Sequence, residues 1–421
     1  MASLLQFLQT LGDVTVVQLV IYLIAGRLIL RRLSGGLREA LFAGLNLAGY
    51  YFFFVRSADI AYSHVFVAYG GLVAVQFLTL RLFAGQPNWK TWIAFYTPIA
   101  FLVLIRYVPA RVLPNLTGHS NEWLFHHPDL SFAPFFVGLS YLAFRTSHLV
   151  LEVRNGVEKM PSFCQYLGFC FFVPTMPVGP INPYHNFRQA FGALPPALPF
   201  VNAAMRILVG LVKFKFLGSL CDRLSYSGLL QDDHYHHWVD LPVAAIFYYL
   251  YLFCNFSGYC DMAIGAAGLM GVPVAENFNN PFAARNVKDF WNRWHITLSV
   301  YMRDVVFAPL SKYFARLFGP AHVNHAVTLP IIVVFLLVGV WHGVGWNYAA
   351  YGAVHALGLV INHYYTLGLK KWLGREGFKA YNANRWIQAA AVTLTFCYCA
   401  ASMFFFANTF PEMKAIFASL K

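Results

Sequence analysis

The stretch IIVVFLLVGVWHGVGWNYAAYGAVHALGLV, residues 331–360, decides the fold, because it lies in a segment, 317–369, without a single Asp, Glu, Lys or Arg. A helix needs roughly 20 apolar residues to cross the hydrocarbon core of a bilayer. Further uncharged stretches of this length are 60–80, 241–260 and 386–411. With 59% hydrophobic and only 11% charged residues, the composition excludes a soluble globular protein. The sequence therefore predicts an all-α polytopic membrane protein.

The excess of positive charge, a formal +13, lies in alternate loops between the apolar stretches rather than in one patch. Clusters of Arg and Lys follow the first apolar stretch, at 27–38, and precede the last one, at 370–385. By the positive-inside rule these loops are cytoplasmic. The pattern argues against nucleic acid as a partner and favours anionic lipids together with an acidic or phosphorylated cytoplasmic ligand.

With the amino terminus outside, the charge rule predicts about ten to twelve transmembrane helices. The expected spans are residues 13–30, 39–55, 60–80, 91–108, 131–151, 200–220, 241–268, 327–342, 346–366 and 386–409. Two other segments are not regular spans: the proline-rich residues 160–187 predict a broken or re-entrant element, and the aromatic, partly charged residues 282–318 predict amphipathic helices. We expect one domain, 1–421, made of N-terminal helices 1–130, a core 131–366, and a basic cytoplasmic loop with the last span, 367–421.

Two histidines are the first candidates for chemistry, because a polar residue inside an apolar segment is costly and marks function by default. His295 lies in the amphipathic segment, and His342 follows the apolar run 331–341 directly. An imidazole can take a proton from a hydroxyl and return it to a leaving group, as acyl transfer requires. The alternative for each is a hydrogen-bonded interhelical histidine. His355 and His363 lie in an apolar span too, and nothing nearby marks them as reactive.

Other polar groups surround these histidines in the sequence. Asp289 and Arg293 are four residues apart, which favours an ion pair on one helical face over a catalytic role. Asn277 and Asn279 lie in a loop before a proline, where a turn and a substrate contact are equally compatible with the sequence. The cluster 232–237, with two Asp and three His, lacks the spacing of a metal site, so no metal is expected.

Four motifs occur in order: Asn255-Phe-Ser-Gly-Tyr-Cys-Asp261, Glu276-Asn-Phe-Asn279, Phe290-Trp-Asn-Arg-Trp-His-Ile-Thr-Leu-Ser299 and Trp341-His-Gly343. Together they resemble the membrane-bound O-acyltransferase (MBOAT) family, and most of all its bacterial branch of teichoic acid D-alanyl transferases and alginate-type polysaccharide O-acetyltransferases. The resemblance implies a ring of tilted helices around a thin central catalytic partition, in a bacterial cytoplasmic (inner) membrane.

The resemblance also implies roles for residues. His342 is the expected catalytic residue and His295 the second active-site histidine. Apart from these two carried-over roles, substrate or donor contacts are expected among Ser257, Tyr259, Asp261, Asn279, Lys288, Asp289, Arg293, Arg303 and Trp341. No cofactor is expected to be bound, since the acyl thioester, on coenzyme A or on a phosphopantetheinyl acyl carrier protein, is a substrate.

The leading hypothesis is an acyltransferase that moves acetyl or D-alanyl from a cytoplasmic thioester to a hydroxyl of a cell-surface polymer or of an extracytoplasmic relay acyltransferase. The rival is a non-catalytic transporter or flippase for an envelope component, whose histidines only gate or relay protons. A third possibility is a structural scaffold. Basic residues of the amphipathic segment, Arg285, Lys288, Arg293, Arg303 and Lys312, suit either donor recognition or anchoring to anionic headgroups.

Overall fold

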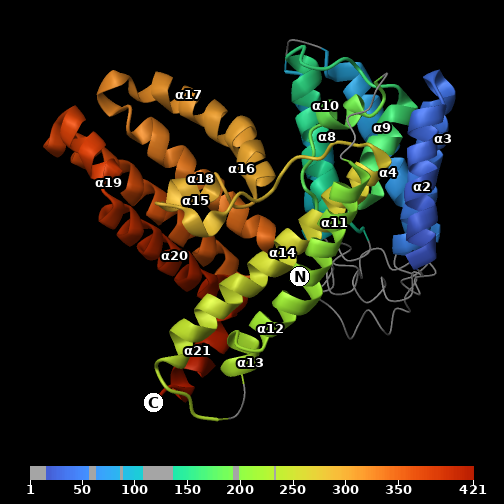
Figure 1. Ribbon diagram of the computed structural model, residues 1–421. Coiled ribbons are helices and arrows are strands. Elements are labelled where there is room, and N and C mark those ends of the chain that lie inside the picture. The colour runs from blue at the N-terminus through green and yellow to red at the C-terminus, as the bar shows by residue number, and fades with distance from the viewer. Residues whose placement is uncertain (1–15, 56–62, 86–88, 108–135, 193–198, 232–233) are drawn as a thin grey trace. The chain divides into compact units, whose positions relative to one another are not determined.

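The residues that the computed structural model describes are 16–55, 63–85, 89–107, 136–192, 199–231 and 234–421. Over these residues the chain forms helices and turns, with two isolated bridges and no strand (Figure 1). The backbone forms two compact units. Unit 1 comprises Met1–Val209 and Cys260–Ala275, and unit 2 comprises Gly210–Tyr259 and Glu276–Lys421. The long helix α14, Asp240–Met270, contributes to both.

Unit 1 contains helices at the first five predicted spans. Predicted residues 131–135 lie outside the described part, so the fifth helix is seen from Leu139. Helix α5 packs on α4 and α8, while α3 packs on α2 and α9. The bounds are α2 Val16–Arg32, α3 Gly35–Tyr50 with the π-turn η1 Tyr51–Val55, α4 Ser63–Phe83, α5 Thr91–Tyr107 and α8 Leu139–Arg154.

The broken element predicted for 160–187 is confirmed, since this stretch holds three short helices: α9 Phe163–Cys170, η5 Val173–Thr175 and α10 Tyr184–Gln189. A buried arginine of α8 ties it to the unit. Arg145 donates to the Thr175 hydroxyl (3.0 Å) and to the last carbonyl of α9, Cys170 O (3.1 Å). Guanidinium donors on a helix C-terminus satisfy carbonyls that lack a partner within the helix.

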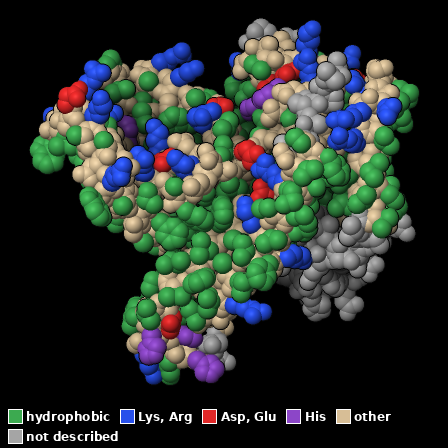
Figure 2. All heavy atoms as spheres, viewed as in Figure 1, with side chains coloured by type: hydrophobic (Ala, Val, Ile, Leu, Met, Phe, Trp, Pro, Cys, Tyr) green, Lys and Arg blue, Asp and Glu red, His purple; other side chains and the backbone are tan. Residues whose placement is uncertain are grey.

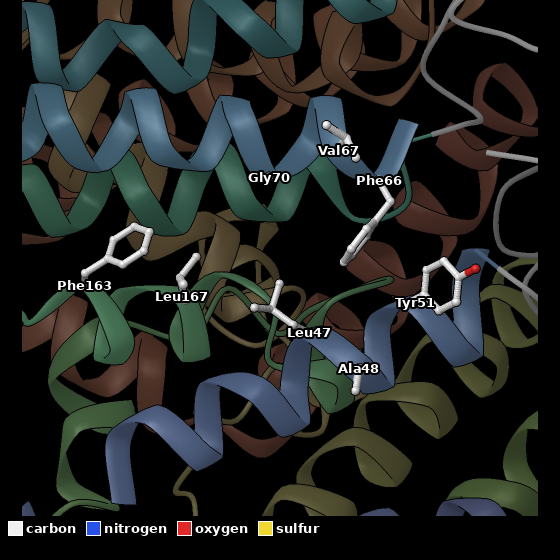
Figure 3. A pocket seen from close by; sticks show the side chains of 8 residues that line it. All are labelled: Leu47, Ala48, Tyr51, Phe66, Val67, Gly70, Phe163 and Leu167. Carbon is white, nitrogen blue, oxygen red and sulfur yellow. The ribbon is translucent and has the colours of Figure 1, made fainter. Parts of the chain in front are cut away.

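An apolar groove lies between α3, α4 and α9 (Figure 3). Its volume is about 550 Å³, and its lining includes Leu47, Phe66, Phe163 and Leu167. The predicted site residues do not line it, so this groove is separate from the candidate chemistry.

Unit 2 is built around three long helices, with α19 packed on both α18 and α20. Two glycines allow α18 and α19 to pack closely. A Cβ on Gly352 would lie 2.2 Å from Phe335 O, and a Cβ on Gly339 would lie 2.3 Å from Tyr348 O. Small residues of this kind let helices approach closely. The bounds are α18 His325–His342, α19 Trp346–Ala383 and α20 Arg385–Ala407.

The remaining segments of unit 2 are short or continue from unit 1. The predicted span 200–220 forms α11 Phe200–Leu211, the π-turn η6 Val212–Leu217 and α12 Gly218–Asp222, followed by α13 Tyr226–Leu229. The predicted amphipathic segment is confirmed as a series of short helices, and α17 buries none of its residues. Its elements are η7 Pro281–Ala283, α15 Val287–Trp291, α16 Ile296–Met302, η8 Arg303–Phe307, α17 Ala308–Phe318 and η9 Pro320–His322.

The basic stretch after residue 366, predicted as a cytoplasmic loop between two spans, is helical. Helix α19 continues through the basic stretch to Ala383, broken only at Gly374, whose φ of 65° lies in the left-handed region. Lys and Arg are compatible with an exposed helix, and the placement of this stretch on the cytoplasmic side stays a prediction. A further helix, α21 Phe410–Ser419, follows the last predicted span and begins with a capping box of Thr409 and Glu412.

Four helices of the described part are long and apolar enough to cross a membrane. They correspond to Phe66–Phe83, Asp240–Met270, His325–His342 and Arg385–Ala407. Several other helices at predicted spans are shorter than this criterion, among them the apolar segment Thr91–Arg106. The count of ten to twelve crossings stays a prediction.

Candidate functional site

His342 is the last residue of α18, and Gly343 ends the helix with an extended backbone, φ −168° and ψ 168°. No residue with a side chain fits at position 343, because a Cβ there would lie 2.0 Å from the ring of Tyr348. The half-buried imidazole lies edge-on to Phe406 of α20 (5.0 Å between ring centroids) and Tyr351 of α19 (6.0 Å). Carbonyl groups at a helix C-terminus favour a positive charge, so this position stabilises the protonated form of the His342 imidazole.

His295 is held by a loop that precedes it by eighteen residues. Its side chain is 2% exposed, and its backbone is left-handed, with φ 46° and ψ 51°. The loop and the segment before His295 are joined by an antiparallel bridge between Phe278 and Trp294, and by the Ile296 amide, which donates to Asn277 O (3.0 Å). The side chain of Asn277 contacts His295 Nδ1 at 3.2 Å. These contacts hold the backbone of His295 in a left-handed conformation that few residues other than glycine adopt, and they fix the position of its ring.

The two histidines lie close together. The indole of Trp341 contacts both rings, with centroid distances of 4.7 Å to His342 and 6.0 Å to His295. Burial first, and then the charge that His342 carries when protonated, hold the pKa of His295 well below its ordinary value. His295 is therefore a neutral base at neutral pH, and protonation of both rings at once is unfavourable.

One ring nitrogen of His295 is available. Its Nε2 atom is buried, and among the residues described it has no hydrogen-bond partner. The ring of Phe256 from α14 packs edge-on at 4.7 Å. A buried polar atom without a partner is costly in a folded protein. A hydrogen-bond donor supplied by a ligand would remove that cost.

His355 provides the contrast. It is fully buried, but both of its nitrogens are used: Trp291 Nε1 donates to Nδ1 (3.3 Å), and the Ser402 hydroxyl contacts Nε2 (3.0 Å). Because the indole nitrogen only donates, Nδ1 accepts and Nε2 carries the hydrogen. His355 thus connects α15, α19 and α20 and is structural, as the sequence suggested by marking nothing reactive near it.

The predicted pair of Asp289 and Arg293 is confirmed. Arg293 Nε donates to Asp289 Oδ1 (2.8 Å), and the same guanidinium reaches the Asn279 carbonyl (3.3 Å). The other carboxylate oxygen accepts from the Arg285 amide (3.1 Å). Asn279 itself is exposed and binds Arg293 through its backbone, so Asn277, two residues earlier, is the one that contacts a histidine. The sequence alone does not distinguish Asn277 from the other asparagines of this loop.

The three candidates near the end of α14 differ in their environment. Ser257 is buried, and its hydroxyl has no partner among the described residues. Tyr259 is buried as well. Asp261 belongs to unit 1, where its carboxylate pairs with Arg206 (3.0 Å).

The remaining basic candidates are on the surface of unit 2. Lys288 and Lys312 are exposed, and Arg303 pairs with the neighbouring Asp304 (2.9 Å). Figure 2 shows Lys and Arg side chains on this surface, in the region of α17. An exposed ion pair contributes little to stability, so this surface is free to serve recognition.

Within the described residues, no group of three or more His, Cys, Asp or Glu side chains has the geometry to hold a metal ion. Asp232 and Asp233 of the His-rich cluster lie outside those residues. His236 and His237 instead make backbone contacts: the His236 amide donates to Ser419 O (3.0 Å), and the His237 amide donates to Asp240 Oδ2 (2.8 Å).

Comparison with known proteins places this geometry in context. The model of a family described as MBOAT, membrane-bound O-acyltransferase family, matches residues 90–404. A teichoic acid D-alanyltransferase of Streptococcus thermophilus is 31% identical over 365 residues, covering 79% of this chain and 85% of that protein. A peptidoglycan O-acetyltransferase of Helicobacter pylori is 28% identical over 53% of this chain and 42% of its own length. A probable alginate O-acetylase of Azotobacter vinelandii is 29% identical over 53% and 44%.

Proposed function

The chain belongs to the membrane-bound O-acyltransferase family and is an acyltransferase, and we propose that it transfers a small acyl group, acetyl or D-alanyl, from a cytoplasmic thioester to an extracytoplasmic hydroxyl. The acceptor is a cell-surface polymer or a relay acyltransferase. The observation that carries the proposal is the buried Nε2 of His295 near His342, which has no hydrogen-bond partner in the part of the chain that the structure describes. The relatives named above act on teichoic acid, peptidoglycan and alginate, which supports an acceptor of this class.

His342 is the general base of the proposed reaction. It takes the proton as the acceptor O–H bond breaks, the oxygen bonds to the acyl carbon, the C–S bond breaks, and the proton passes to the leaving thiolate. The C-terminal carbonyls of α18 stabilise the imidazolium while it holds the proton. Proton and electron pair are thus returned within one turnover, and the reaction needs no other reactant.

His295 has a different role because its environment opposes protonation. It remains neutral and presents a lone pair at Nε2 to a donor on the substrate, such as an amide N–H of a pantetheine arm or a hydroxyl of the acceptor. Filling that buried acceptor orients the substrate beside His342. Trp341, which contacts both rings, fixes their mutual orientation.

The exposed basic residues of the amphipathic segment supply the donor side. Coenzyme A and phosphopantetheinyl carrier proteins are both anionic, and a positive surface raises the rate of their encounter. The same residues bind anionic headgroups of the bacterial cytoplasmic membrane, which the chain crosses several times. In this proposal the chain is one domain with its catalytic core at 131–366.

The test is turnover by purified protein in lipid nanodiscs. Release of thiol from acetyl-CoA, or from acetyl- or D-alanyl-loaded carrier protein, is followed with and without a polymer acceptor. His342→Ala is expected to lower turnover about 10²- to 10⁴-fold. His322→Ala is the control, because His322 is exposed on η9. Mass spectrometry of surface polymers from cells with and without the gene identifies the acyl group.

Near-normal turnover in the His342 variant would remove this residue from the reaction. Transport of an envelope component that survives replacement of both histidines would favour the rival transporter. Activity that disappears with a chelator and returns with Zn²⁺ would instead identify the histidines as metal ligands.

A further inference from the structure

The side-chain oxygen of Asn277 is an unusually crowded acceptor. It lies 3.2 Å from the backbone nitrogen of Thr297, 2.9 Å from the Thr297 hydroxyl and 3.2 Å from Nδ1 of His295. Asn277 is 1% exposed, so water does not compete for these contacts. All three contacts are made to Oδ1 of Asn277, which lies eighteen residues before His295 and twenty before Thr297 in the sequence.

The backbone amide settles which atom of the Asn277 carboxamide is the oxygen. A backbone N–H only donates, so the atom that it contacts is an acceptor and is Oδ1. An oxygen without a hydrogen cannot donate to His295. The ring nitrogen that faces it, Nδ1, therefore carries the hydrogen, and the lone pair of the neutral ring is on Nε2.

We propose that Asn277 is a positioning residue of the acyltransferase site: it fixes His295 as the Nδ1–H tautomer, so that the buried Nε2 presents its lone pair to the substrate. This inference rests on the proposed function. It gives a chemical reason for the available nitrogen described above, since the opposite tautomer would present an N–H at that point and could not accept a hydrogen bond.

Asn277 also fixes the orientation of the ring through the backbone. Its carbonyl accepts from the Ile296 amide (3.0 Å), and its side chain accepts from the next amide, that of Thr297. These two bonds bracket the left-handed conformation of His295, which the chain does not favour without tertiary support. The side chain that selects the tautomer thus also aims the ring.

A purely structural role makes a different prediction from a positioning role. If Asn277 only held the loop, any loss of activity would follow the loss of folded protein, and the ionisation of His295 would be irrelevant. If it selects the tautomer, a stronger acceptor at the same place keeps activity but changes its pH dependence. The Thr297 hydroxyl offers a matched control, because Thr297→Val removes one bond to Asn277 and leaves the contact with His295.

In the part of the chain that the structure describes, few titratable groups lie near the ring of His295. Among the described residues, His342 on α18 is the titratable group that acts on His295, and the contacts from α14 and α18 are the uncharged rings of Phe256 and Trp341. Asn277→Asp would place a carboxylate against Nδ1–H and favour the imidazolium. Protonation of His295 removes its lone pair, so the acid limb of kcat/KM is expected to move to higher pH.

The experiment compares Asn277→Leu, Asn277→Asp and Thr297→Val with the intact protein in nanodiscs. Turnover is measured from pH 5 to 9, and the tautomer is read from ¹⁵N shifts of labelled histidine, with His295 assigned by its absence in His295→Phe. Asn277→Leu is expected to lower kcat about 10- to 100-fold, as removing a partner that orients a functional histidine does. Asn277→Asp is expected to keep kcat at high pH with its acid limb shifted upward, and Thr297→Val to match the intact protein in both.

The opposite results overturn the inference. They are an Nε2–H signal for His295 in the intact protein, or an unshifted acid limb in a folded Asn277→Asp protein. If Asn277→Leu does not fold, the Asp variant still decides. Failure of the proposed function is separate: it shows as no thioester turnover, or as turnover that is indifferent to His342, while the nitrogen shifts still report whether Asn277 sets the tautomer.

Discussion

His295 and His355 are two of the buried histidines of unit 2. Replacing each of them by Phe tests separately which one supports turnover and which one supports stability. His295 and His355 are 2% and 0% exposed, and each packs among aromatic rings. They differ in hydrogen bonding, since His355 uses both nitrogens and His295 leaves Nε2 without a partner in the described part of the chain. Replacing each by Phe is therefore expected to have opposite consequences.

In His355→Phe, the Trp291 indole N–H and the Ser402 hydroxyl lose their contacts with the ring. A buried group left without a partner costs about 1–3 kcal/mol, whereas hydrogen bonds measured inside membrane proteins average about 0.6 kcal/mol. The Ser402 hydroxyl keeps its bond to the Cys399 carbonyl (2.7 Å), so the indole N–H of Trp291 is the group that loses its acceptor, at a cost of about 0.6–3 kcal/mol. The flat stacking on Phe290 survives, because a phenyl ring replaces an imidazole. This variant should be clearly less stable, with its remaining folded fraction still active.

In His295→Phe, no donor is left without an acceptor. Asn277 Oδ1 keeps both contacts with Thr297, and the unpartnered Nε2 is removed. Phe carries the same Cβ into the left-handed backbone, so the change in stability is expected to be about 1 kcal/mol or less. Turnover, however, should fall at least about 10²-fold, because the substrate loses its acceptor.

The assay measures two quantities on each protein: the thermal midpoint of the monodisperse fraction in detergent, and thiol release per folded molecule in nanodiscs. The reasoning predicts a lowered midpoint with normal specific turnover for His355→Phe, and the reverse for His295→Phe. An unfolded His295 variant, or a His355 variant that is as stable as the parent but inactive, would refute it.

Two further predictions concern charge. Reversal at both exposed lysines, Lys288→Glu with Lys312→Glu, should raise the apparent KM for the thioester donor at low salt and have a smaller effect at high salt, where charges are screened over about 8 Å or less. A donor KM indifferent to charge and salt would leave only membrane anchoring as their role. The second concerns pH: the pKa of His295 lies below its ordinary value, so as the pH falls below about 6.5 the unfolded chain takes up a proton that the folded state does not. The contribution of neutral His295 to the free energy of unfolding is therefore fully present above that pH and is lost as the pH falls. The thermal midpoint of His295→Phe should decline less steeply with falling pH than that of the parent. Equal dependence of the two midpoints on pH would contradict this.

Much of the local structure follows from the sequence. The helices at 16–32, 63–83 and 325–342 lie where apolar runs predict them, because the length of an apolar run is a property of consecutive residues. The ion pair of Asp289 and Arg293 is equally local, since residues four apart on a helix face each other. The proline-rich break and the amphipathic segment follow from composition in the same way.

The sequence by itself determined the membrane class of this protein and singled out His295 and His342, because apolar runs and short motifs are properties of consecutive residues. Only the tertiary structure decided which hydrogen-bond partners each buried histidine has. It joined His295 to Asn277 across eighteen residues and His355 to Trp291 across sixty-four, which left one ring with an available nitrogen and the other with none. The physical reason is that a hydrogen-bond partner is chosen by proximity in the folded chain, and the closing of long loops leaves no periodic signal in the sequence.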